Sequence, residues 1–479
     1  MSPSSALFLA AAAALATACA AQPQAPSQLP ATAANAADPA AAGRAPFSST
    51  YAPAPSEPTL IRGATVLTGT GTRIDDGDVL IAGGKIQAVG SSLAAPEGAR
   101  IVEAKGRWVT PGLIDVHSHM GVYASPGTDA LDDGNESTDP VTSQVWAEHS
   151  VWPQDPGFEA ALQGGVTSMQ ILPGSANLIG GRGVTVKVVP ATTYQAMKFP
   201  GAPHGLKMAC GENPKRVYGR DDRFPSTRMG NVAGYRQAFA DAKDYMEDWK
   251  EYDAKLAKHQ KDVAEGDDDS TAPQPPKRDL KLETLAEVMR GNILVHNHCY
   301  RADEMATMLD IAQEFGYKIA AFHHGVEAYK LADRLAAEGV CGGLWADWWG
   351  FKMEAYDGIQ ENLAIVDYPE GGCAIVHSDS DEGIQRLNQE AAKAMTRGQL
   401  AGLDIPPERA IRWVTANAAK ALGILDQTGT LDAGKMGDVV VWNGTPFSVY
   451  ALADLVFVDG VLLYDRAHPA PKPRSDFQL

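Results

Sequence analysis

Residues 111–120 have the sequence PGLIDVHSHM, and this stretch decides the fold. An apolar run, residues 113–116, leads into two histidines, His117 and His119. Side chains two residues apart on a β-strand point to the same face, so we expect the two imidazoles side by side at the end of a buried strand. Two imidazoles so placed suit one transition metal. Because the pair alone is not specific, its meaning depends on partners elsewhere in the chain.

The length, net charge and cysteines of the chain limit the classes of protein to which it can belong. With 479 residues the chain is too long for one small domain and long enough for a large core. A formal net charge of −18 excludes a general nucleic-acid binder, because no basic face could dominate the surface. The five cysteines show no CxxC pair, and four of them lie in or beside apolar runs. They are Cys19, Cys210, Cys299, Cys341 and Cys373. We therefore expect buried free thiols and not a disulfide framework.

Residues 1–20 are predicted to be an export signal. Residues 6–18 are apolar but short for a membrane span, and small residues follow them. Residues 15–19, LATAC, loosely resemble a lipobox that would place a lipid anchor on Cys19. A plain signal peptide cleaved after Ala18 or Ala20 is the alternative, and an alanine-rich tail without a targeting role is a third. Either signal predicts an exported bacterial protein, periplasmic or lipid-anchored in the envelope.

Residues 21–58, rich in Ala, Pro, Ser and Gln, are predicted to be a linker.

Short strand-like runs separated by Gly and Asp turns lie toward both chain ends. Residues 59–109 contain four such runs, and Gly83-Gly84 is typical of a hairpin. Residues 429–479 contain three more. Because neither set has enough strands for a stable sheet, we predict that the two ends meet in one small β-sandwich.

Residues 110–428 alternate strand-like and helix-like segments, which indicates an α/β domain with a parallel sheet. The eight candidate strands are residues 113–119, 166–172, 184–189, 206–212, 293–298, 318–324, 340–345 and 373–379. They predict a TIM-like (β/α)₈ barrel, whose active site lies at the C-terminal strand ends. A helical insert, residues 232–290, has an aromatic stripe between Tyr235 and Val263. The stripe could cover the barrel mouth, form a subunit interface or pack on the outer helices.

Further metal-ligand side chains end other predicted strands: Glu212, His298, His324 and Asp379. Pro214 is expected to stop the fourth strand just after Glu212, whose carboxylate could bridge two divalent metals. A carbamylated Lys207 is the rival bridge, but it lies at the other end of the predicted strand, so Glu212 is preferred. Asp379 could bind metal and take a proton from the attacking water, with a helix N-cap as the alternative. His296 and His377 are expected one layer deeper, as supports. Adjacent residues of a strand face opposite ways, so His324 is expected to turn inward and His323 to have a structural role.

Together these motifs resemble the amidohydrolase superfamily of metal-dependent hydrolases. The resemblance rests on residues 111–119, His298, His324, Ser378-Asp379 and the segments 415–423 and 429–438, and it covers about residues 59–465. It implies a distorted (β/α)₈ barrel with a terminal β-sandwich. It also implies that His117, His119 and Asp379 hold one metal, that His298 and His324 hold a second, and that Glu212 bridges them. Zinc is expected, two ions per chain or else one.

Within the superfamily the chain is most similar to an exported, imidazolonepropionase-like branch that includes dipeptidases. The resemblance implies that a metal-activated water hydrolyses C–N bonds in small peptides or N-acyl amino acids, with Asp379 as the catalytic residue. The alternatives with one metal are an imidazolonepropionase-like cyclic amide hydrolase, a deaminase and a lactonase. A non-enzymatic binding module is disfavoured because no ligand is missing.

Loop residues are candidates for holding a small-molecule or short-peptide substrate. They are Asn177, Arg182, Arg216 and Tyr218. Either arginine could pair with a substrate carboxylate, although a surface ion pair is the alternative. A homo-oligomer is compatible with the sequence.

Overall fold

The computed structural model describes residues 48–267 and 269–469. The predicted export signal and residues 21–47 of the predicted linker lie outside these ranges, as do residues 470–479. The Ser49 hydroxyl donates to the Lys198 carbonyl at 2.7 Å, and the Thr50 amide donates to the Gln195 carbonyl at 3.0 Å. The last part of the predicted linker is therefore docked on the folded domain. Among the described residues, no helix is both long enough and apolar enough to cross a membrane.

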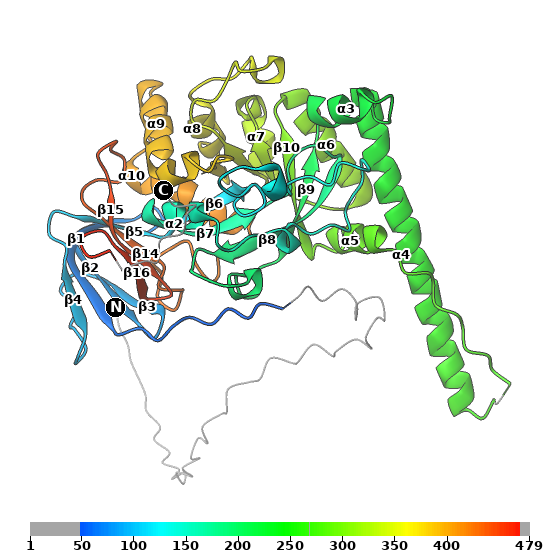
Figure 1. Ribbon diagram of the computed structural model, residues 1–479, viewed down its shortest axis with the longest axis horizontal. Helices are drawn as coiled ribbons and strands as arrows, with labels where there is room; N and C mark the ends of the chain where they lie inside the picture. Colours follow the sequence, from blue (N-terminus) through cyan, green and yellow to red (C-terminus); the bar gives the residue numbers. More distant parts are fainter. Residues whose placement is uncertain (1–47, 268, 470–479) are drawn as a thin grey trace, which may run out of the picture. The chain divides into compact units, whose positions relative to one another are not determined.

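Strands from both ends of the folded part join in one eight-stranded sheet (Figure 1). Its order is β16-β15-β14-β5-β1-β2-β3, with β4 also beside β1. The strands are β1 Thr59–Leu67, β2 Arg73–Ala82, β3 Lys85–Gly90, β4 Arg100–Glu103, β5 Trp108–Pro111, β14 Val439–Trp442, β15 Ala453–Val458 and β16 Val461–Asp465. Strand β5 pairs with β1 on one side and with β14 on the other. The ends meet as predicted, but the hydrogen bonds form one continuous sheet and do not separate the two sheets of a sandwich.

A second eight-stranded sheet forms a nearly closed barrel with the order β13-β12-β11-β10-β9-β8-β7-β6. Its strands are β6 Leu113–Ser118, β7 Val166–Ile171, β8 Ile179–Lys187, β9 His204–Ala209, β10 Ile293–Cys299, β11 Ile319–His324, β12 Cys341–Leu344 and β13 Ala374–Val376. Each predicted strand overlaps one of these. The Asp379 amide donates to the His117 carbonyl at 3.0 Å, which brings the segment after β13 beside β6.

Strand β8 departs from the predicted parallel arrangement, because it runs antiparallel to both β7 and β9. Only residues 172–178 connect β7 to β8. A parallel crossover needs a dozen or more residues, so this short connection can only turn the chain straight back. β8 also begins at Ile179, five residues before the predicted start at residue 184.

Helices cover the barrel, and one of them extends far from it (Figure 1). They are α2 Pro156–Gln163, α3 Glu212–Gly219, α4 Arg228–Ala264, α5 Leu280–Met289, α6 Ala302–Phe315, α7 Ala332–Glu338, α8 Asn362–Asp367, α9 Leu387–Leu400, α10 Pro407–Ala410 and α11 Ala416–Ala421. Short 3₁₀ helices are Asp129–Leu131, Ala147–His149, Tyr194–Ala196, Ala328–Leu331, Met353–Ala355, Gly383–Arg386 and Ile411–Val414. The 37-residue α4 contains most of the predicted stripe. Its Phe239 ring packs on Phe315 and Tyr317, at and after the end of α6. This contact supports packing on an outer helix.

Four cysteines form two disulfides, so the prediction of free thiols is wrong. Cys210–Cys299 joins the C-terminal ends of β9 and β10, and Cys341–Cys373 joins the N-terminal ends of β12 and β13. The paired Cα atoms lie 5.2 and 4.6 Å apart. Neighbouring parallel strands place these residues side by side although 89 and 32 residues separate them in sequence.

Replacing either cysteine pair with serines is expected to lower the free energy of unfolding by roughly 3 to 5 kcal/mol, because the loop is then no longer closed in the unfolded chain. Urea unfolding of each double-serine variant measures the loss. Thiol titration of the unfolded, non-reduced protein should find none of these four cysteines free. Unchanged unfolding midpoints for both variants would contradict the two pairings.

Candidate metal centre

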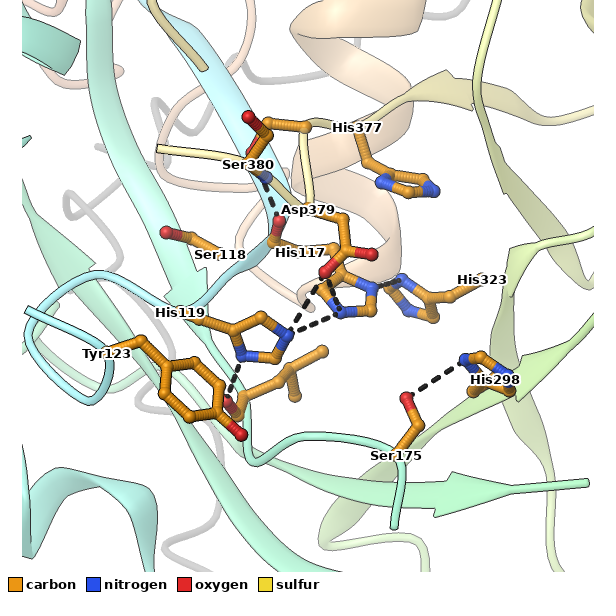
Figure 2. Close-up of polar contacts among 12 residues, drawn as sticks. His117, Ser118, His119, Tyr123, Ser175, His298, His323, His377, Asp379 and Ser380 are labelled. Atoms are coloured by element: carbon orange, nitrogen blue, oxygen red, sulfur yellow. Dashed lines mark hydrogen bonds and ion pairs between the residues drawn. The ribbon is translucent and has the colours of Figure 1, made fainter. Parts of the chain in front are cut away.

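Two histidines and one carboxylate converge at the C-terminal end of β6, as the opening motif predicts. The His117 Nε2 atom lies 3.3 Å from His119 Nε2. Asp379, three residues beyond β13, places its Oδ1 atom 3.4 Å from His117 Nε2 and 3.1 Å from His119 Nε2. Figure 2 shows the three side chains pointing toward one another. Two ring nitrogens and a carboxylate oxygen in this arrangement are a donor set for a divalent cation.

His298 and His324 form a second group next to the first. His298 is the next-to-last residue of β10 and His324 is the last residue of β11, and their ring centroids are 4.6 Å apart. The His324 Nε2 atom lies 3.9 Å from Asp379 Oδ2, so the Asp379 carboxylate faces both groups. The backbones of His324 (φ +71°) and Asp379 (φ +51°) are left-handed. Non-glycine residues seldom adopt this conformation, and such strain gathers at functional sites.

Lys207, and not Glu212, lies among these ligands. Its Nζ atom lies 3.3 Å from His117 Nε2 and donates to the Pro173 carbonyl at 3.0 Å. Strand β9 ends at Ala209, and Glu212 is the first residue of α3. The Glu212 carboxylate is instead paired with Lys352 at 3.3 Å. The strand-end position predicted for Glu212 is therefore wrong, and Lys207 is near the C-terminal end of the strand because that end comes three residues earlier than predicted.

Burial gives these groups the protonation states that metal ligands need. It lowers the pKa of His117, His298 and His324 well below 6.5, and the neighbouring Lys207 charge lowers them further. Burial alone would raise the pKa of Asp379, but the hydrogen bond and charge of His119 lower it overall. Burial also lowers the pKa of Lys207 to about 8. Neutral imidazoles and an ionised carboxylate are ready to bind metal, so the donor set fits divalent cations.

A deeper layer of side chains orients the ligand rings. His117 Nδ1 lies 3.0 Å from His323 Nδ1, and His323 Nε2 lies 2.9 Å from His296 Nδ1. His119 Nδ1 donates to the Leu172 carbonyl at 2.8 Å, which leaves its Nε2 with a free lone pair. His296 therefore lies in the deeper layer that the strand register predicts. His323 has the structural role expected of it, but it lies in the same layer as His296 and does not face away from the ligand rings. His377 joins it by accepting from the His324 amide at 3.3 Å.

Asp115 and Ser175 are two supports that the sequence reasoning missed. The buried Asp115 carboxylate accepts from the His117 amide at 3.1 Å, from the Ser378 amide at 3.2 Å and from the Ser378 hydroxyl. It thus fixes β6 to the segment that positions Asp379. Strand alternation places residues 115, 117 and 119 on one face and could have identified it. Ser175 Oγ lies 2.9 Å from His298 Nδ1, and no spacing rule would have paired them.

The four predicted substrate-binding residues lie on β8, on α3 and in the loop before β8: Asn177, Arg182, Arg216 and Tyr218. The Asn177 amide and the Tyr218 hydroxyl both donate to the Asp139 carbonyl at 2.8 Å. Arg182 is buried and donates to Thr284 Oγ1, whereas Arg216 is exposed. Asn177 and Tyr218 thus hold the loop that contains Asp139, and Arg182 joins β8 to α5. Contact with substrate stays a prediction for all four residues.

The buried histidines predict acid sensitivity of the metal-free protein. The unfolded chain takes up protons below about pH 6.5, whereas His117, His298, His323 and His324 resist protonation in the folded state. Stability contributed by these four rings is therefore expected to fall as the pH drops below 6.5, by about 1.4 kcal/mol per pH unit for each ring. Urea unfolding in a chelator between pH 5 and 8 measures this slope. Stability that is constant or increases toward pH 5 would contradict the burial of neutral rings.

Comparison with known proteins identifies the family to which the chain belongs. Residues 376–463 match the model of the Amidohydrolase family. The crystal structure of an amidohydrolase from Thermotoga maritima MSB8 is 35% identical, with a TM-score of 0.74, and the match covers 85% of this chain and 100% of that one. The chain therefore belongs to the amidohydrolase family.

Two curated relatives extend the comparison. Amidohydrolase tasK of Hapsidospora irregularis is 33% identical over 480 residues, which cover 91% of this chain and 46% of that protein. The chain thus spans about half the length of this relative. An imidazolonepropionase of Mesorhizobium japonicum is 24% identical over 384 residues, which cover 77% of this chain and 85% of that protein.

Proposed function

We propose that this protein is an exported, metal-dependent amidohydrolase that hydrolyses C–N bonds of small peptides or N-acyl amino acids. The observation that carries the proposal is the convergence of four histidines, Asp379 and Lys207 at the C-terminal strand ends of the barrel. This is the end at which barrel enzymes have their active sites. The family of the chain supports hydrolysis as the type of reaction.

The ligand assignment follows the two groups of side chains. His117, His119 and Asp379 would hold one divalent cation, and His298 and His324 would hold a second. Lys207, as a carbamate, would supply the further ligand oxygens that the sequence analysis expects from Glu212. Its lowered pKa leaves part of the amine neutral near pH 7 to 8 and able to react with carbon dioxide, and the resulting carbamate has two oxygens to offer. Zinc suits this mixture of nitrogen and oxygen donors.

The reaction needs a strong nucleophile, a polarised carbonyl and a proton carrier. When bound, divalent cations lower the pKa of water and polarise the substrate carbonyl. The Asp379 carboxylate faces both histidine groups, so it can accept the proton of the attacking water and pass it to the leaving amine. His323 and the Leu172 carbonyl keep the His117 and His119 rings in place during this transfer.

We also propose that the protein is exported by a signal in residues 1–20. In one version of this proposal the signal is that of a lipoprotein, and Cys19 carries a lipid anchor. Both predicted features lie outside the described residues. The two disulfides support export, because disulfides persist in oxidising compartments and are rare in the bacterial cytoplasm. A periplasmic enzyme of this kind would meet small peptides from the surroundings.

A mononuclear cyclic amide hydrolase is the second candidate. It is favoured by the similarity to an imidazolonepropionase over 77% of this chain. Metal content separates the two, because the peptidase proposal expects about two ions per chain and the alternative about one.

The proposal is tested with metal-reconstituted protein and a library of dipeptides and N-acyl amino acids, with cyclic amides, aminated heterocycles and lactones in parallel. His119→Ala is the negative control, because it removes one ligand that is partly exposed. Hydrolysis of library members by the wild type alone is the expected result. No hydrolysis of any dipeptide or N-acyl amino acid would overturn the proposal.

A further inference from the structure

An open cavity of about 460 Å³ lies at the protein surface directly beside Asp379. Two carboxylates, those of Asp347 and Asp379, border it. The rest of its lining consists of aromatic side chains, namely Tyr300, Trp345, Trp348, Trp349 and Phe351. The cavity shares Asp379 with the metal centre, so a substrate whose scissile bond lies there can extend into it.

The aromatic rings form a continuous wall that starts at a metal ligand. His324 stacks on Trp345 with centroids 4.3 Å apart, and Trp345 stacks on Trp348 at 5.1 Å. Tyr300 stacks on His324 at 5.4 Å and meets Phe351 edge to face at 6.2 Å. Trp345 and Tyr300 are buried and supported on several sides, so this base of the wall is rigid.

The outer rings of the wall are exposed and lie next to one another. Trp348, Trp349 and Phe351 leave 43%, 52% and 57% of their surfaces accessible. Clustered apolar side chains of this size on a protein surface mark a binding site, and ligand pockets are commonly lined by aromatic rings with few polar groups. The contact of this cluster with the metal centre favours substrate as its occupant over a partner protein.

The charges around the cavity favour a neutral occupant. Asp347 is paired with Lys393 at 3.2 Å, and Asp379 belongs to the metal centre. The Lys352 ammonium already lies 4.0 Å from the Tyr300 ring centroid and 6.0 Å from that of Phe351. Lys352 is itself paired with Glu212 at 3.3 Å, so each of these charges already has a partner and none calls for an ionic substrate group.

We propose that this aromatic cavity is the substrate side-chain subsite and that it takes a large, neutral, apolar group, aromatic or branched aliphatic, next to the scissile C–N bond. The inference rests on the proposed function, because Asp379 places the subsite relative to the reaction. It narrows the substrate class to peptides or N-acyl amino acids with Phe- or Leu-like side chains.

The test compares kcat/KM for substrates that differ in one side chain, with Gly, Leu, Phe, Asp or Lys placed on either side of the scissile bond. The wild type is expected to prefer Phe or Leu over Gly by about tenfold or more. Trp348→Ala and Phe351→Ala should lose about tenfold on the Phe and Leu substrates, mainly through KM, and less than about threefold on the Gly substrate. Tyr450→Ala is the matched control, because Tyr450 is an exposed aromatic residue between β14 and β15.

A preference for Asp or Lys, or equal losses on all substrates, would overturn the subsite. If nothing is hydrolysed, the proposed function fails, and calorimetry with N-acetylphenylalanine and N-acetylglycine still tests the cavity. Tighter binding of the phenylalanine compound by the wild type, lost in Trp348→Ala and Phe351→Ala, supports the subsite, and equal binding overturns it. Sedimentation velocity tests the remaining possibility, namely that a second copy of this chain packs on the aromatic rings. A dimer that dissociates in Phe351→Ala with unchanged selectivity would assign the rings to a second copy of this chain.

Discussion

The substitution Asp379→Asn is expected to lower kcat/KM by at least about 10³-fold without unfolding the protein. It removes the charge that faces both histidine groups and the oxygen that can accept a proton. Asparagine has the same shape and tolerates the left-handed backbone that Asp379 adopts at φ +51°. The loss should therefore come from chemistry and not from strain.

Asp381→Asn is the matched control, because Asp381 is an exposed carboxylate two residues further along the same segment. Steady-state kinetics with saturating metal and a thermal melt are measured for both variants. If Asp379→Asn keeps more than about a tenth of the wild-type kcat/KM, Asp379 is neither an essential ligand nor the proton carrier.

Lys207→Met is expected to lower the bound metal to about one ion per chain or less and to reduce kcat/KM by at least about 100-fold. Methionine is close to lysine in length and adapts to a buried site, but it offers no amine. Glu212→Gln is the paired variant, and it should keep both metal and activity because Glu212 contacts Lys352 instead of the cluster.

Metal content of the two purified variants is measured by mass spectrometry after identical reconstitution, and circular dichroism checks that each is folded. Loss of metal in Glu212→Gln together with retention in Lys207→Met would restore the assignment first drawn from the sequence. It would also contradict the ligand group seen in the structure.

The positions of the barrel strands followed from sequence because buried strands are apolar runs between turn residues. The direction of β8 could not be predicted from its residues, because an apolar run is compatible with both a parallel and an antiparallel strand. Only the short connection 172–178 indicates that β8 is antiparallel to β7. The joining of both chain ends in one sheet was predictable from the shortage of strands at each end. The order in which the strands of this sheet are hydrogen-bonded could not be predicted.

The site was predictable wherever a histidine or aspartate follows an apolar strand, as at His117, His119, His298, His324 and Asp379. The strand-end position predicted for Glu212 is wrong because proline can end a strand but is equally common in the first turn of a helix, where Pro214 lies. Gly211, with φ +81°, is the turn at which α3 starts, and it moves Glu212 away from the strand end. Contacts between distant segments, such as Ser175 with His298 and Cys210 with Cys299, have no local sequence signal.

Titration of the metal-free protein with Zn²⁺, while hydrolysis of the best library substrate is followed, tests the central claim most directly. We expect no activity without metal and a rise that levels off near two equivalents per chain, because the two ligand groups can hold about two ions. His119→Ala should show no such rise. Full hydrolysis by metal-free protein, or an equal rise in His119→Ala, would contradict the assignment of the reaction to this metal centre.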